Sequence, residues 1–114
     1  MTYIDEFKRI LPRNMLAVAC DLKPIGSADL AWRYEDIKIV LAALKVRSRV
    51  ILGGEIYSIG EEGIKLTWDA WDYRTDPGLP QEVNVERSYK AALSYIESYH
   101  KECGEDFCYS VIFR

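Results

Sequence analysis

The sequence predicts an α+β fold, in which a small antiparallel sheet of three to four strands packs against about three helices. One observation is a pair of strand-like runs, Val50–Ile59 and Ile64–Tyr73, separated by a polar Gly-Glu-Glu-Gly segment. β-Branched and aromatic residues dominate both runs, which indicates a β-hairpin. The second observation is a helical apolar period both before and after this hairpin. The 114 residues are enough for one core, so we expect a single globular domain spanning residues 1–114.

The segment before residue 30 predicts only short elements. Apolar residues recur at close to helical spacing up to Pro12, which would end a short first helix. Met15–Cys20 is apolar and fits either a buried strand or a helical turn, because its periodicity does not distinguish them. Asp21–Asp29 contains proline, glycine and serine and is predicted to be a loop.

Two longer helices are predicted from clearer patterns. Over residues 34–46 the apolar side chains follow helical spacing, with acidic residues in the first turn and a lysine in the last. Trp32, directly before this helix, is expected to anchor its entry. A second helix is expected from a cap at Asn84 to residues 100–103, where Gly104 would stop it.

The two-residue period of a strand divides Ile64–Tyr73 into two faces. One face would carry Ile64, Leu66, Trp68 and Ala70, and the other would carry Lys65, Thr67, Asp69, Trp71 and Tyr73. We expect the first, more apolar set to face the core. In the preceding strand the alternation breaks at Gly53-Gly54, which predicts a bulge, a bend or close packing of another backbone there. Phe107–Phe113 is a candidate third strand.

Charge and composition exclude several function classes. The net charge of −3 and pI near 5.2 provide no basic surface for nucleic acid, so no nucleic-acid partner is expected. No apolar run reaches the roughly 18 residues that cross a membrane, and acidic residues near the amino terminus argue against a signal peptide. The expected location is therefore cytoplasmic, away from any membrane. The three cysteines, Cys20, Cys103 and Cys108, match no zinc or redox spacing and are expected to be buried, reduced thiols.

No catalytic residue, metal ligand or cofactor site is predicted, so the chain is not expected to be an enzyme. His100 is the only histidine, and no serine or cysteine accompanies it in a recognised pattern. One alternative stays open, a small carboxylate-dependent protein that binds or cleaves sugars. It requires Glu55 to face Asp69 or Asp72 across a cleft, with about 5 to 10 Å between the carboxyl groups. Trp71 and Tyr73 would then serve as sugar platforms.

The same hairpin also has the composition of a protein interface. On the predicted faces, Asp69 and Trp71 lie together opposite the core. An outward tryptophan rimmed by charge is typical of a protein-binding hot spot. The alternative, that helices pack on both sides of the sheet and bury Trp71, is equally compatible with the sequence.

Four segments together resemble the immunity protein forty family of bacterial polymorphic toxin systems. They are Leu30–Asp36, Ile51–Tyr57, Trp68–Trp71 and the spaced residues Ser88, Ala92, Tyr95, Ile96 and Tyr99. The similarity extends over most of the chain from about Asp21 onward. It implies a small cytoplasmic protein, encoded beside a toxin, that binds the cognate toxin domain and blocks it; it implies no catalytic residue.

On this hypothesis the predicted partner-binding residues lie in the hairpin. Trp71 and Tyr73 would form the centre, and Glu55, Asp69 and Asp72 would supply negative potential. If the toxin were a nuclease, these carboxylates could replace substrate phosphates in its basic cleft. An exposed edge of the hairpin or of the third strand could also pair with a second copy to form a homodimer.

Overall fold

Six strands form one antiparallel sheet within residues 3–114, the part of the chain that this computed structural model describes. They are β1 (Cys20–Asp21), β2 (Leu30–Arg33), β3 (Ile51–Gly60), β4 (Gly63–Asp72), β5 (Phe107–Ser110) and β6 (Ile112–Phe113). Their order is β1-β2-β5-β3-β4, and β6 pairs with β3 beyond the end of β5. The predicted three to four strands are too few, because β1, β2 and β6 have only two to four residues and show no period.

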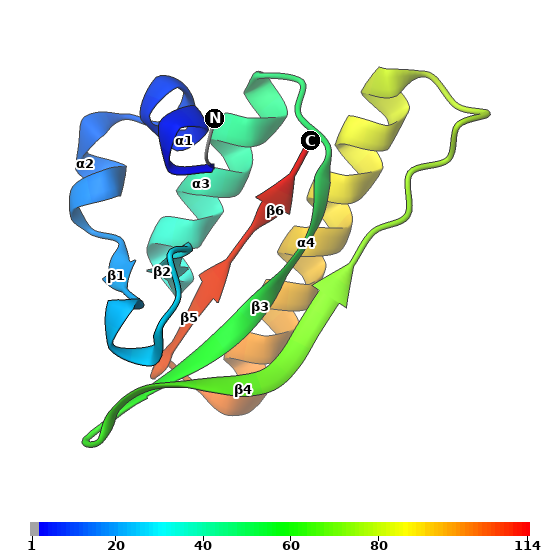
Figure 1. Cartoon of the computed structure of the whole chain (residues 1–114). Helices are drawn as coiled ribbons and strands as arrows, with labels where there is room; N and C mark the ends of the chain where they lie inside the picture. The colour runs from blue at the N-terminus through cyan, green and yellow to red at the C-terminus, as the bar shows by residue number, and fades with distance from the viewer. Residues whose placement is uncertain (1–2) are drawn as a thin grey trace.

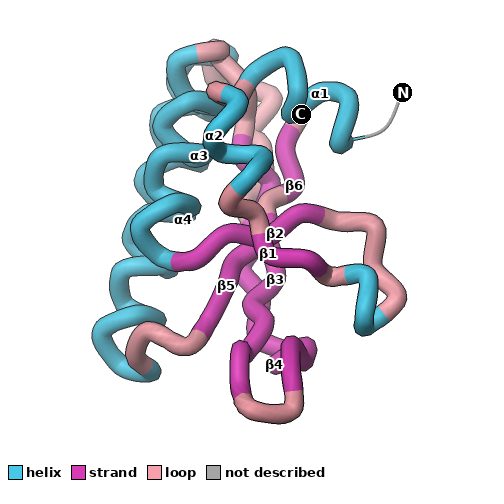
Figure 2. The backbone as a smooth tube through the Cα atoms, turned by 90° about the vertical axis from the view of Figure 1, so that its left-hand side faces the viewer, coloured by secondary structure: helices cyan, strands magenta, loops and turns pink. Residues whose placement is uncertain are grey.

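Four α-helices, rather than about three, occur in the same residues. They are α1 (Tyr3–Ile10), α2 (Arg13–Ala17), α3 (Tyr34–Val46) and α4 (Gln81–Cys103). The helices α3 and α4 pack against each other and lie behind the sheet in Figure 1. Figure 2 shows that the short 3-10 turn η1 (Lys23–Ile25) lies on the opposite side of the sheet. The undecided segment Met15–Cys20 contains most of α2 and the start of β1.

The start of α4 differs from the prediction. Asn84 does not cap this helix, which begins three residues earlier, directly after Pro80. Instead its buried amide fastens the connection from β4. The Asn84 Oδ1 accepts hydrogen bonds from the Tyr73 hydroxyl (2.7 Å) and the Asp76 N–H (2.9 Å), and Nδ2 donates to the Asp76 carbonyl (2.9 Å). Gly104 ends the helix, as predicted. Its φ of 96° suits glycine, but its ψ of −162° lies outside the left-handed region expected for a glycine cap.

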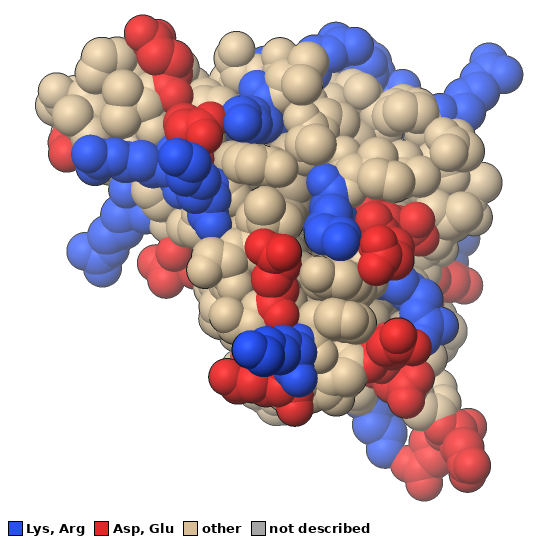
Figure 3. All heavy atoms as spheres, turned by 180° about the vertical axis from the view of Figure 1, so that it is seen from behind, with Lys and Arg blue, Asp and Glu red and all other residues tan. Residues whose placement is uncertain are grey.

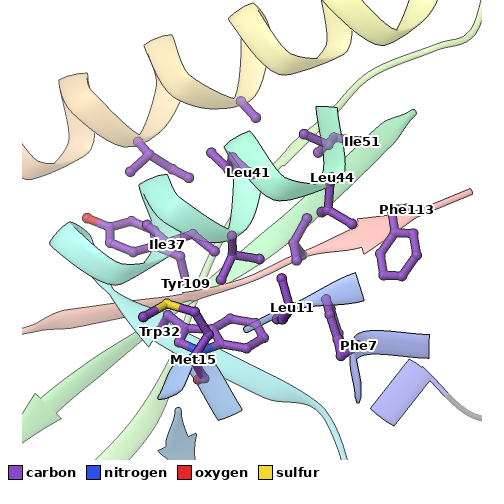
Figure 4. Close-up of a cluster of buried hydrophobic side chains, with 14 of the residues drawn as sticks. Phe7, Leu11, Met15, Trp32, Ile37, Leu41, Leu44, Ile51, Tyr109 and Phe113 are labelled. Atoms are coloured by element: carbon purple, nitrogen blue, oxygen red, sulfur yellow. Dashed lines mark hydrogen bonds between the residues drawn. The ribbon is translucent and has the colours of Figure 1, made fainter. Parts of the chain in front are cut away.

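The main core lies between the helices and the sheet, and Trp32 is its largest fully buried side chain. Its indole Nε1 donates a 2.6 Å hydrogen bond to the Met15 carbonyl, so α2 is tied to β2. Phe7 of α1 meets the indole edge-on with 5.2 Å between ring centroids. Figure 4 shows these side chains converging from α1, α2, α3 and the sheet. The expected anchoring role of Trp32 is confirmed.

The Gly53-Gly54 pair lies where other chain segments come closest to β3. A Cβ atom on Gly54 would lie closer than 3.0 Å to the Ser110 carbonyl oxygen and to the Trp71 ring. The register between β3 and β6 also shifts between Ile51 and Gly53. The predicted irregularity and the predicted close packing are therefore both found at this pair.

A larger bulge, not predicted, lies in β4. Glu55 pairs with Ala70 and Tyr57 pairs with Leu66, so residues 67–69 of β4 lie opposite Ile56 alone. Extra residues of this kind bend a strand and change where its side chains point. This bulge determines how the candidate site is built.

The two faces of the sheet are covered unequally. We call the side that bears Ile56, Trp71 and Tyr109 the helix face, since these residues belong to the main core. The other side, which bears Glu55, Tyr57 and Cys108, is the open face, and η1 covers only part of it.

The assignment of the core face of β4 from the sequence is therefore wrong. Ile64 and Leu66 do not enter the main core; they pack on Tyr57 and Leu22 in a small second cluster on the open face. Trp68 is 86% exposed, whereas Trp71 is buried. The alternation itself is correct, but apolar residues occur on both faces, and the side on which the helices lie cannot be read from one strand.

Candidate functional site

The five predicted partner-binding residues are divided between the two faces of the hairpin. Directly paired residues share a face, and Glu55 pairs with Ala70 while Asp72 pairs with Gly53. Glu55 and Asp72 therefore lie on the open face. Asp69, Trp71 and Tyr73 belong to the alternate set and contact α4 instead.

The three residues on the helix side hold β4 against α4. Trp71 stacks on Tyr95 with 5.5 Å between ring centroids, so its own chain covers it. The Tyr73 hydroxyl donates to Asn84, as described above. Asp69 accepts a 2.8 Å hydrogen bond from the Tyr99 hydroxyl. Of the two alternatives for Trp71, burial by the chain's own helices is the one found.

Negative charge is concentrated in the hairpin. Residues 51–72 carry five acidic side chains and one lysine, a net charge of −4. The rest of the chain carries 13 acidic and 14 basic side chains, a net charge of +1. On the open face, burial raises the pKa of Tyr57, and the carboxylates of Glu55 and Asp29 raise it further. The outer surface of α3 and α4, by contrast, mixes both signs (Figure 3).

Trp68, which is not among the predicted site residues, is presented to solvent by the β4 bulge. Its φ of 71° lies in the left-handed region, which bulky residues rarely adopt. The Thr67 hydroxyl donates to the Ile56 carbonyl (2.8 Å) and accepts from the Asp69 N–H (3.1 Å), which closes the bulge. The only sequence signal is that threonine and aspartate, which bond readily to nearby backbone, flank the tryptophan.

We expect the support of this bulge by Tyr99 to weaken at high pH. Burial, followed by the hydrogen bond to Asp69, raises the pKa of Tyr99 from 10.0 to about 12. Because the folded-state pKa lies above the unfolded value, this contribution to the free energy of unfolding is complete below pH 10.0 and is lost as the pH rises through about 12. Urea denaturation of the wild-type protein and the Tyr99→Phe variant should give a stability difference that shrinks across this interval. A pH-independent difference would contradict the expectation.

The positions of the candidate catalytic groups disfavour carbohydrate cleavage by the predicted pair. Glu55 lies on the open face and Asp69 is bonded to Tyr99 of α4, so they do not face each other across a cleft. Glu55 and Asp72 are diagonal neighbours on an open sheet surface. His100 stacks on Tyr34 with 3.7 Å between ring centroids, and its Nδ1 is buried with no hydrogen-bond partner among the described residues.

Within residues 3–114, no group of three or more histidine, cysteine or acidic side chains is arranged to hold a metal ion. Of the three free cysteines, Cys108 is buried, Cys20 is half-buried and Cys103 is exposed, so the expectation of buried thiols holds fully only for Cys108. No helix in this part of the chain has the length and apolar content to cross a membrane.

Comparison with protein-family models gave a match. A family model described as Immunity protein 40 matches residues 21–113. The matched segment contains α3, the complete hairpin, α4 and the last two strands, and therefore the whole candidate site. Searches of curated proteins and of solved structures gave no match.

Proposed function

The chain belongs to the Immunity protein 40 family, and from this premise we propose that it neutralises a toxin by binding the cognate toxin domain in the cytoplasm. The acidic hairpin is the proposed docking region. The observation that carries this assignment is the net charge of −4 on residues 51–72, against +1 on the rest of the chain. A concentrated field of one sign steers a partner of opposite sign and speeds encounter.

The proposed mechanism is occlusion, with no chemical step. The toxin domain would have basic residues in or around its active cleft. These would contact the carboxylates of the open face, Glu55 and Asp72. Tight binding of this kind would exclude the toxin's substrate from the cleft. Asp69, Trp71 and Tyr73 would contribute indirectly, because they hold β4 on α4 and so fix the docking surface.

The experiment that tests this function uses the product of the gene immediately upstream as the candidate toxin. That product would be expressed in a bacterial host with and without this protein, and the purified pair would be examined for complex formation. We expect growth arrest without this protein, growth with it, and a stable complex. A toxic neighbour that is neither bound nor neutralised would contradict the proposal.

Removing the two open-face charges should slow association with the toxin. The double variant Glu55→Gln/Asp72→Asn keeps side-chain size and removes two of the five hairpin carboxylates. We expect the association rate constant at low salt to fall about 3- to 10-fold and its dependence on salt to weaken, because steering scales with local charge. Surface plasmon resonance over a range of salt concentrations measures both.

The matched control for this double variant is Glu35→Gln/Glu97→Gln. Both carboxylates are exposed, Glu35 on α3 and Glu97 on the side of α4 that bears Lys90 and Lys101. The same loss of total charge there should leave the association rate nearly unchanged. Equal slowing by the two double variants would show that net charge, and not the hairpin, is responsible.

A further inference from the structure

Trp68 combines two properties that are unfavourable in the isolated chain. Its side chain is 86% exposed, more than any other large hydrophobic side chain among the described residues, the next being Val46 at 80%. Its backbone has a φ of 71°, a conformation that is strained for a residue with a large side chain. Strain at an exposed aromatic residue is a reason to look for a function.

The surrounding bonds keep this conformation fixed. Thr67 bonds to the neighbouring strand at Ile56 and to the backbone of Asp69, on the far side of Trp68. The Asp69 carboxylate is in turn held by Tyr99, which comes from α4. Hydrogen bonds to β3 on one side and to α4 on the other therefore hold the bulge in place. A side chain presented on a fixed backbone loses less entropy on binding than one on a mobile loop.

We infer that Trp68 is the aromatic anchor of the toxin interface, and that it enters an apolar pocket with a basic rim on the toxin domain. This inference rests on the proposed function. The basic rim follows from charge, because the turn and β4 carry Glu61, Glu62, Asp69 and Asp72. Lys65 is the only basic residue there, and Glu62 already pairs with it at 2.5 Å.

A second copy of this chain fits the surface less well. β4 is the edge strand of the sheet, and edge strands commonly pair with each other. Here the bulge at residues 67–69 interrupts the row of backbone groups that such pairing needs. Two hairpins, each with a net charge of −4, would also repel. The charge that disfavours a second copy favours a basic partner.

The test separates binding from stability by replacing Trp68 with glycine. Glycine adopts a positive φ without strain, so the Trp68→Gly variant should unfold at the same or a higher denaturant concentration than the wild-type protein. Its affinity for the toxin, measured by isothermal titration calorimetry, should fall about 30-fold or more, as expected for a central tryptophan. The Trp68→Ala variant should show a similar loss of affinity. Val46→Ala, which truncates another exposed apolar side chain, should bind like wild type.

Each outcome distinguishes this inference from the proposed function. If the Trp68→Gly variant binds the toxin as tightly as the wild-type protein does, the role of Trp68 is overturned and the proposed function is left intact. A toxin that does not bind the wild-type protein would overturn the proposed function itself. Self-association of the wild-type protein in analytical ultracentrifugation, abolished by Trp68→Gly, would overturn the toxin as occupant and assign the anchor to a second copy.

Discussion

Replacing Trp32 with alanine is expected to lower the free energy of unfolding by about 4 kcal/mol, the middle of the range for a buried tryptophan. The indole is 0% exposed and meets the Phe7 ring edge-on within the main core (Figure 4). Its removal leaves a cavity where α1, α2 and β2 meet. It also removes the 2.6 Å hydrogen bond that the Met15 carbonyl oxygen accepts from the indole N–H. Since small domains have about 5 to 15 kcal/mol in total, this loss would leave a marginal fold.

Equilibrium denaturation in urea, followed by far-UV circular dichroism, measures this effect. The Trp32→Phe variant separates its two parts, because phenylalanine keeps most of the ring volume but cannot donate to Met15. We expect it to be destabilised by roughly half as much as the alanine variant. A loss below about 1 kcal/mol for alanine would contradict the central position of Trp32.

Replacing Gly54 with alanine is expected to cost about 3 kcal/mol or more, the upper end of the range for overpacking. The added methyl group would lie closer than 3.0 Å to the Ser110 carbonyl oxygen and to the Trp71 ring. Neither can move easily, because the carbonyl belongs to the adjacent strand and the indole is held between β3 and Tyr95 of α4. The sheet would have to separate locally, and Trp71 would lose its stacking.

Gly60→Ala is the matched control in the same strand. A Cβ atom on Gly60 meets nothing within 4 Å. This substitution should therefore change the free energy of unfolding by less than about 1 kcal/mol, with a small gain from the stiffer unfolded chain. Thermal unfolding of both variants tests the contrast. Similar midpoints would mean that the close approach at Gly54 has no energetic consequence.

Sequence patterns predicted the long elements well, because each has enough residues to show a period. The helix over residues 34–46 is found as predicted, and Gly104 ends α4. The hairpin is also found, but Gly60 pairs with Gly63, so its turn has two residues and not the four that the Gly-Glu-Glu-Gly segment predicts. The short strands β1, β2 and β6 were not predictable in this way, since they exist only through pairing with distant segments. Asn84 has the composition of a cap, but tertiary hydrogen bonds to Tyr73 and Asp76 place it inside the helix.

The candidate site was predicted only in part, for a geometric reason. The carboxylates Glu55 and Asp72 do share a solvent-facing surface, and the charge of the hairpin is visible in the sequence. The alternation predicts Trp68 on the core face, but Trp68 is exposed. For Trp71 the sequence leaves burial open, and Trp71 is buried. The alternation of β4 does not reveal which face the helices cover, and it does not reveal a bulge closed by Thr67, Asp69 and Tyr99.

The place of β5 in the sheet has a consequence for when the newly made chain can fold. β5 lies between β2 and β3, with Tyr109 paired to both Trp32 and Ile56. The earlier strands therefore cannot join until residues 107–110 leave the ribosome. Pairing of such distant segments makes folding slow, in the range of milliseconds to seconds for sheet-rich domains. On the proposed function, a nascent chain would therefore give no protection before residues 107–110 have emerged and paired with β2 and β3.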